Sequence, residues 1–573
     1  MKNPAKHRRW LSPWAAVVLP LLLIALACGV AEKPTPTPTS APVAVPTATK
    51  VPTATPTPTP AGGVPQRGGT LVQYGAYPPH WDQTQLCCPD GLINLTKIYM
   101  TFMYEPEGEK RYECDLCKNW SLQDGGKTMV FSLRDDIKFH NGTTITSRDM
   151  KYTLEKLTGK VDKVVNTRMG FVKEYITAIE APDDRTLILR LVRPAPVVTA
   201  ALAVALAAIL PDGTKRADLS APPLGPGSKY TSGPFFVKEA VPDSHILYER
   251  NPDYFKKGLP YLDSIKIQVF TEVSAAATAL LVGKVDLFAQ LDSPPKQFWP
   301  QLYKDEKAGK MGSITRPQWC TPGNLFLNMN DPLIKDKNVR HAINLALDRV
   351  EYGDVRYGGD FVPATHFPAG TQWGRPENEI WDVMEGYGRG AKKKAEREQA
   401  KKLLADAGYP NGIDKFELMS SATDFAQGGG EVIQRGLKAG GINATMLANP
   451  PDATQRWGQG KYTVHNFRAC LAIDDPDEVV AGYFLKGGAR NLQFYENPEV
   501  DRLYPLMSAE TDPIKRKQLF IQIENIVYDD LPIITGVDGN RNYWFNSKLR
   551  GFNPGFTLYG TGTNRGESWW LGK

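Results

Sequence analysis

Residues Trp120–Leu154 read WSLQDGGKTMVFSLRDDIKFHNGTTITSRDMKYTL, and they carry the clearest local pattern of the chain. Lys127–Arg134 alternates apolar and polar residues, which predicts a half-buried β-strand. Asn141–Gly142 predicts a tight turn, because both residues tolerate positive φ. Thr146 is expected to cap a helix, with Asp149 three residues later in a capping-box-like position. The stretch therefore predicts a strand, a turn and a helix, but by itself no function.

The same residues resemble a signature of the family 5 solute-binding proteins, the peptide- and nickel-type receptors of bacterial and archaeal ABC importers. The matching positions are Trp120, Asp124, Gly125, Phe131, Leu133, Arg134, Lys138, Phe139, His140, Gly142, Thr146 and Asp149. Asn141 stands where the family has Asp, and Ser147 where it has Ala. Later segments also resemble family motifs: SGPF (232–235), ERNPDYF (249–255), LLVGKVD (280–286), NVRHAINLALDR (338–349) and AKKLLADAGYP (400–410). The resemblance thus covers nearly all of the folded chain.

The length and the alternation of elements indicate the fold class. At 573 residues the chain is too long for one core, so two or three domains are expected. Strands and amphipathic helices alternate, which indicates an α/β or α+β fold, and we predict α/β. The resemblance implies two lobes of the periplasmic-binding-protein (Venus-flytrap) type, with an extra inserted subdomain. It implies a first lobe at 65–110, 222–328 and 541–573, an inserted subdomain at 111–221 and a second lobe at 329–540.

The N-terminus predicts export and anchoring. Residues 1–27 place basic residues before an apolar run that is too short to span a bilayer comfortably, which indicates a secretory signal. The run ends in ALAC (25–28), which resembles a lipobox and makes Cys28 the expected lipidation site. Residues 28–64 are rich in Pro and Thr and predict an extended tether. We therefore expect a lipid-anchored protein on the extracytoplasmic face of the membrane, while Arg8–Arg9 leaves Sec and twin-arginine export both open.

The net charge excludes one class of partner. The chain carries a formal charge of +6, but removal of residues 1–27 takes away four positive charges and no negative ones, which leaves +2. That balance is too small to predict nucleic acid or an anionic surface as the main partner.

Six cysteines follow Cys28: Cys87, Cys88, Cys114, Cys117, Cys320 and Cys470. An even number in an exported protein favours disulfides. The resemblance implies a bond between Cys320 and Cys470. The other four predict two cross-links between the Cys87–Cys88 pair and the Cys114–Cys117 pair, each closing a loop of about 30 residues. A zinc site built from the same four sulfurs is the alternative, disfavoured because adjacent cysteines are poorly placed to chelate one ion.

Motifs for catalysis are mostly missing. The sequence has no HExxH, GxSxG, P-loop or dinucleotide-binding glycine motif. Ser293 and Lys296 fit SxxK, but the SDN and KTG partners of a penicillin-recognising enzyme are absent from the sequence. We therefore expect no enzyme activity, no cofactor and no metal ion. An extracytoplasmic hydrolase of the penicillin-binding type is the alternative from another class.

The resemblance also implies a ligand cleft between the lobes. In peptide-binding relatives, one wall is the loop after the first strand, which corresponds here to Ala76–Asp82. Tyr77, His80 and Trp81 of this loop are candidate ligand contacts, because aromatic rings can stack on sugars or on apolar side chains.

The opposite wall corresponds to Arg468–Pro476. In relatives an Asp of this segment takes the amino terminus of the peptide, since a buried ammonium group needs a paired carboxylate. That position is Ala472 here, and the family's Trp is Ala469. Asp474, two residues further on, is the candidate replacement.

Phe467 and Arg468 complete the candidate ligand contacts. Phe467 offers a ring for stacking. Arg468 introduces a cation that either binds a carboxylate or phosphate of the ligand or pairs with Asp474 or Asp475 in its own loop. We predict a receptor, expected to be a monomer, that delivers a peptide-like solute to an ABC permease. An oligosaccharide is the next candidate, and a metal chelate the third.

Overall fold

The computed structural model describes residues 63–86, 89–106, 112–161, 163, 166, 168–290, 293–421, 428–555 and 564–572. All of them belong to one compact unit, 59–573. The predicted signal segment, Cys28, the tether up to residue 62, Cys87 and Cys88 lie outside the described residues. None of the helices in the described ranges is both long and apolar enough to cross a membrane.

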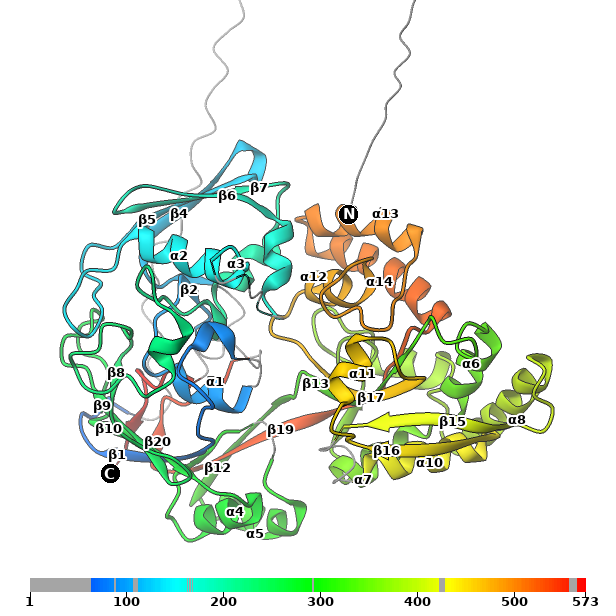
Figure 1. Ribbon diagram of the computed structural model, residues 1–573. Helices are drawn as coiled ribbons and strands as arrows, with labels where there is room; N and C mark the ends of the chain where they lie inside the picture. The colour runs from blue at the N-terminus through cyan, green and yellow to red at the C-terminus, as the bar shows by residue number, and fades with distance from the viewer. Residues whose placement is uncertain are drawn as a thin grey trace, which may run out of the picture. The chain divides into compact units, whose positions relative to one another are not determined.

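The first sheet has eight strands, in the order β12-β19-β11-β1-β10-β9-β8 with β14 paired to β19 (Figure 1). The strands are β1 (Thr70–Gly75), β8 (Phe235–Val241), β9 (His245–Arg250), β10 (Ser264–Val269), β11 (Leu287–Phe288), β12 (Met311–Pro317), β14 (Phe361–Pro363) and β19 (Val537–Asn546). β1 runs parallel to β10 and β11, and the other pairs are antiparallel. Helices α4 (Val273–Leu281) and α5 (Trp299–Lys307) pack against β11 and β12.

The second sheet contains the stretch that opened the sequence analysis. Its order is β4-β5-β7-β6, with β4 (Cys117–Gln123), β5 (Thr128–Leu133), β6 (Ile176–Asp183) and β7 (Thr186–Leu191). The predicted strand is β5, and the predicted helix is α2 (Ser147–Leu157), which packs on β6. The capping box is present, with the Thr146 backbone N–H donating to Asp149 Oδ2 at 2.8 Å. A short strand pair, β2 (Met103–Tyr104) and β3 (Glu113–Cys114), precedes this sheet, and α1 (Pro89–Leu95) and α3 (Pro196–Leu202) flank it in the chain.

The third sheet has the order β16-β15-β17-β13-β18. Its strands are β13 (Cys320–Leu327), β15 (Ile413–Ser420), β16 (Ile442–Ala448), β17 (Val464–Cys470) and β18 (Ile533–Ile534). The accompanying helices are α6 (Lys337–Ala346), α7 (Arg349–Tyr357), α8 (Ala391–Asp406), α10 (Gly429–Ala439), α11 (Ala453–Gly458), α12 (Pro476–Val479), α13 (Pro498–Ala509) and α14 (Pro513–Asp530). α13 lies close to α3, so the region of the second sheet meets the helices of the third (Figure 1).

The fold has two lobes, and the chain passes between their sheets at two short links as well as at β14, which pairs with β19 from between α7 and α8. Residues 318–319 lead from β12 to β13, and residues 535–536 lead from β18 to β19. β13 lies in the third sheet, within the range expected for the first lobe, which ended at residue 328. β19 lies in the first sheet and begins before residue 541, where the last part of the first lobe was expected to begin. Trp319, which has φ +57°, lies against the start of β19, because its backbone N–H donates to Asp538 Oδ2 at 3.1 Å.

Candidate functional site

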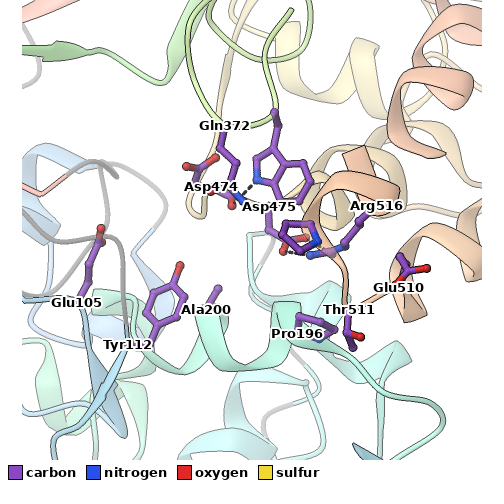
Figure 2. Close-up of a pocket in the computed structure, with 12 residues that line it drawn as sticks. Glu105, Tyr112, Pro196, Ala200, Gln372, Asp474, Asp475, Glu510, Thr511 and Arg516 are labelled. Atoms are coloured by element: carbon purple, nitrogen blue, oxygen red, sulfur yellow. Dashed lines mark hydrogen bonds and ion pairs between the residues drawn. The ribbon is translucent and has the colours of Figure 1, made fainter. Parts of the chain in front are cut away.

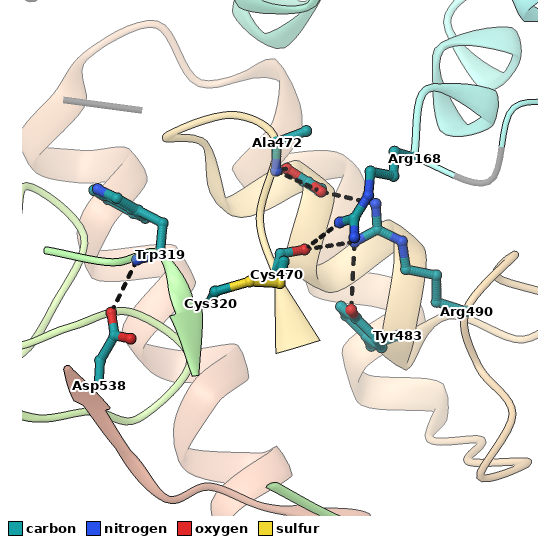
Figure 3. The surroundings of a disulfide bond; sticks show 9 residues. Arg168, Trp319, Cys320, Cys470, Ala472, Tyr483, Arg490 and Asp538 are labelled. Carbon is teal, nitrogen blue, oxygen red and sulfur yellow. Dashed lines mark hydrogen bonds and ion pairs between the residues drawn. A yellow bond between two sulfur atoms is a disulfide. The ribbon is translucent and has the colours of Figure 1, made fainter. Parts of the chain in front are cut away.

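The loop between β17 and α12 contains the predicted ligand segment, and its backbone is held from within the second lobe. Glu478 accepts hydrogen bonds from the backbone N–H groups of Ala472 (2.8 Å to Oε2) and Ile473 (2.8 Å). Arg490 in turn binds Glu478 at 2.8 Å (Figure 3). Ala472 is fully buried. Ala472 is therefore a packed core residue.

A cavity of about 280 Å³ lies beside the end of this loop. It is lined by Glu105, Tyr112, Pro196, Ala200, Gln372, Trp373, Asp474, Asp475, Glu510, Thr511, Pro513 and Arg516. Tyr112 and Ala200 lie on one side of it, and Asp474 and Arg516 lie on the other (Figure 2). The expected inserted subdomain and the second lobe thus both contribute to its walls.

The elements around the cavity fix several of these side chains. Asp512 caps α14 by accepting from the backbone N–H of Ile514 at 2.9 Å, which places Arg516 in the first turn of the helix. Trp373 donates its indole N–H to the backbone carbonyl of Asp474 at 2.9 Å (Figure 2). The guanidinium of Arg516 lies over the Trp373 ring, 5.3 Å from its centroid. Trp373 is therefore connected to Asp474 by a hydrogen bond and to Arg516 by a cation–π contact.

Acidic groups predominate in the lining. It contains four carboxylates, Glu105, Asp474, Asp475 and Glu510, and one cation, Arg516. Arg516 forms a bidentate ion pair with Asp475, with both bonds at 2.7 Å. Arg516 also binds Asp477 behind the cavity, so its charge is already compensated.

The pKa of Tyr112 is also raised by the acidic lining. Burial raises its pKa well above 10, and the carboxylates of Glu105, Asp474 and Asp475 raise it further. The negative charges of these three carboxylates are therefore felt at the Tyr112 hydroxyl, which lines the cavity. A cavity with this lining favours a cationic group, which both carboxylates and aromatic faces attract.

The predicted loop Ala76–Asp82 contributes no residue to this cavity. Trp81 is 1 % exposed, and its ring meets that of Tyr77 edge-on at 6.0 Å between centroids. The backbone carbonyl of Trp81 accepts from the Tyr99 hydroxyl at 2.6 Å. His80 is half-buried, and burial and the nearby Arg216 lower its pKa. The structure thus uses Trp81 as a core residue.

Phe467 and Arg468 lie on β17, away from the cavity lining. Phe467 is 37 % exposed and packs on Trp457, with 4.8 Å between ring centroids. Arg468 forms no ion pair with Asp474 or Asp475. Asp475 takes Arg516 instead, and the charge of Arg468 lowers the pKa of buried Asp538.

The cysteines pair along neighbouring strands. Cys320 is bonded to Cys470, its register partner across β13 and β17 (Figure 3). Cys114 is bonded to Cys117, with 5.1 Å between their Cα atoms, so the expected cross-links to Cys87 and Cys88 are replaced by a local bond. The reason is that Cys114 ends β3 and Cys117 begins β4. With those two sulfurs consumed, the four-sulfur zinc alternative has no ligand set, and within the described ranges no group of His, Cys, Asp or Glu residues is arranged to hold a metal.

Ser293 and Lys296 do not form a dyad. Ser293 Oγ accepts from the backbone N–H of Asn542 at 3.0 Å. Lys296 Nζ donates to the backbone carbonyl of Gly358 at 2.5 Å. Each side chain thus binds a different backbone segment, which leaves the hydrolase alternative without a nucleophile–base pair at SxxK.

The sequence did not single out most of the cavity residues. Glu105, Tyr112, Trp373, Glu510 and Arg516 come from separate segments that carry no motif. Asp474 is the only cavity residue among the candidate ligand contacts. The sequence signal for Asp474 was its place two residues after Ala472, in the segment that the resemblance implies to be a cleft wall.

Known proteins resemble this chain in sequence and in fold. Residues 111–491 match the family described as bacterial extracellular solute-binding proteins, family 5 Middle. The oligopeptide-binding protein AppA of Bacillus subtilis is 24 % identical over 542 residues, which cover 89 % of this chain and 93 % of AppA.

Two solved structures share the fold. The periplasmic binding protein DppA of Helicobacter pylori, in complex with the peptide STSA, superposes with a TM-score of 0.70 and 22 % identity, covering 89 % of this chain and 99 % of that one. AgaA of A. tumefaciens R10, in complex with agropinic acid, gives 0.72 and 23 %, covering 88 % and 99 %.

Proposed function

The chain belongs to the bacterial extracellular solute-binding proteins of family 5, and on this premise we propose that it binds a peptide-like solute through a positively charged group. Members of this family are extracytoplasmic binding components of ABC importers, and not enzymes. The cationic group is the amino terminus or a basic side chain of the solute. The proposed partner that receives the solute is an ABC permease.

The observation that carries the proposal is the cavity beside Asp474. Its lining has four carboxylates and one cation, and that cation is already paired with Asp475 and Asp477. A desolvated ammonium or guanidinium group is stable only where carboxylates and hydrogen-bond acceptors replace its water. Asp474 thus stands in for the carboxylate that Ala472 lacks. Tyr112 adds an aromatic face, which also attracts cations.

An oligosaccharide is the second candidate. The aromatic side chain of Tyr112 in the cavity lining suits stacking on a sugar ring. A sugar does not require the excess of carboxylates, so we rank it below a cationic peptide. The N-terminal sequence pattern supports a lipid anchor at Cys28 and a tether over 28–64. The family resemblance supports a monomer in which 111–221 is inserted into the first lobe.

Native mass spectrometry of the purified protein is the first test, because closed receptors bury most of a ligand's surface and retain it. A retained peptide or amine supports the proposal, and a retained sugar or anion overturns it. Calorimetry with trialanine, lysyl-dialanine and N-acetyl-trialanine then tests the charge. N-acetylation is expected to abolish trialanine binding if the amino terminus occupies the cavity.

Asp474→Asn links the result to the site. Loss of one charge-assisted hydrogen bond corresponds to about 1.5–3 kcal/mol, so affinity for the cationic peptide is expected to fall about 10- to 100-fold. Asp452→Asn is the matched control, because Asp452 is exposed and lies outside the cavity lining. Equal affinities of both variants and the unchanged protein would count against the cavity as the ligand site.

A further inference from the structure

Among the described residues, three side chains of the expected inserted subdomain contact the second lobe, namely Tyr175, Arg193 and Arg168, and one of them connects to the ligand cavity. Tyr175 lies just before β6, and its hydroxyl donates to Asp477 Oδ1 in α12 at 2.6 Å. Tyr175 and Asp477 are both fully buried. The Tyr175 hydroxyl also shares a hydrogen bond with the Tyr504 hydroxyl of α13.

Asp477 continues this connection to the cavity wall. Its second oxygen binds Arg516, and Arg516 holds both carboxylate oxygens of Asp475 at 2.7 Å. Asp475 and Arg516 line the cavity (Figure 2). A continuous series of buried, charge-assisted hydrogen bonds therefore runs from Tyr175 to the ligand site, although Tyr175 does not line the cavity.

The second contact packs around the same tyrosine. The guanidinium of Arg193 lies over the rings of Tyr175 (4.9 Å to the centroid) and Tyr504 (5.4 Å), and its Nε donates to Ser508 at 3.3 Å. The third contact is separate. Arg168 Nη1 donates to the backbone carbonyl of Cys470 at 2.7 Å (Figure 3).

We infer that Tyr175 is a positioning residue for the ligand site: its bond to Asp477 holds the lobes together and, through Arg516, orients Asp475 in the cavity wall. The assignment of the site as a ligand cavity rests on the proposed function, whereas the role in closure does not. Contacts that cross between lobes exist only while the lobes are together, so they shift the population towards the closed form. Affinity for any ligand enclosed by both lobes rises with that population.

The test is Tyr175→Phe, which removes the hydroxyl and keeps the ring under Arg193. Hydrogen–deuterium exchange of the full-length protein without ligand is measured in α3 and in α12, the elements on either side of the interface. Exchange there is expected to be several-fold faster in the variant, since opening exposes these amides more often. Tyr495→Phe is the matched control, because its hydroxyl donates to the carboxylate of Asp530 at 2.6 Å within the second lobe alone.

A kinetic readout separates positioning from general packing. Dissociation of lysyl-dialanine from Tyr175→Phe is expected to be about 10-fold faster, with little change in association, because loss of a bond to a charged group shortens the life of the closed complex. Unchanged exchange in α3 and α12, with an unfolding midpoint equal to that of the control, overturns the inference. If the unchanged protein binds no peptide, the proposed function fails, while the exchange measurement still decides the role of Tyr175.

A second variant covers the case in which Tyr175→Phe does not fold. Arg168→Gln removes the contact to the Cys470 carbonyl, and Arg168 is only half-buried. Faster exchange in the same two elements supports closure by the inserted subdomain. Exchange equal to that of the unchanged protein contradicts it.

Discussion

A buried carboxyl group at the crossing between the lobes gives a pH dependence that can be measured. Asp538 is fully buried in β19, and burial raises its pKa to about 7. The backbone N–H of Trp319 and the charge of Arg468 oppose this rise only in part. At neutral pH the folded protein therefore holds a carboxyl group that is close to half-protonated.

The size of the effect follows from linkage. An unfolded Asp has a pKa of about 3.9, so between about pH 4 and pH 7 the folded state keeps a proton that the unfolded state has lost. Because this pKa is raised on folding, its stabilising contribution is complete below pH 4 and is lost as the pH rises through 7. One pH unit corresponds to about 1.4 kcal/mol, which makes the total loss about 4 kcal/mol.

Asp538→Asn removes the titration while keeping the shape and the acceptor for Trp319. The free energy of unfolding is measured in urea at pH 5 and pH 8 for both proteins, with exposed Asp452→Asn as control. Relative to the variant, the unchanged protein is expected to lose about 3 kcal/mol between these pH values. A difference between the two proteins that stays constant from pH 5 to pH 8 would refute the argument, because Asp538 would then have the same charge at both.

Two further predictions concern buried charges. Arg565→Met is expected to lower the free energy of unfolding by about 3–5 kcal/mol, because it leaves fully buried Asp115 without its bidentate partner at 2.7 and 3.0 Å. Urea unfolding measures this loss. Arg250→Met is the control, because its ion pair with Asp263 is partly exposed, and an equally large loss of stability in that variant would contradict the role of burial. Burial opposes the ionisation of Glu524, yet the hydrogen bond with His366 helps to hold its pKa at about 2. Glu524→Gln is therefore expected to lower the free energy of unfolding by about 3 kcal/mol at pH 7 and by about half of that at pH 3, since this contribution is lost as the pH falls towards 2. Urea unfolding at both pH values tests this, and an equal loss at pH 3 and pH 7 would be evidence against it.

Local structure was predictable where local interactions decide it. The alternation in 127–134 and the cap at Thr146 gave β5 and α2, because side-chain alternation and capping act within a few residues. Strand membership at the lobe boundaries was not predictable in this way. β13 joins the third sheet through its pairing with β17, whose residues lie more than a hundred positions later in the chain.

The same distinction applies to Arg468. One of its two expected partners was Asp474 or Asp475, which lie close to it in the sequence. In the structure Asp475 binds Arg516 of α14, which offers a bidentate geometry and a second carboxylate at Asp477. Short sequence separation is therefore a weak guide where a buried partner from another helix can satisfy more hydrogen bonds.

The cavity lining also depends on contacts between distant parts of the chain. Its carboxylates come from both sides of the interface, with Glu105 next to β2 and Asp474 and Asp475 before α12. A cationic group in the cavity is therefore fully paired only when the lobes are closed, because carboxylates on one wall alone leave part of it facing water. Binding and closure then depend on one network, in which Arg516 serves the cavity through Asp475 and the lobe contact through Asp477.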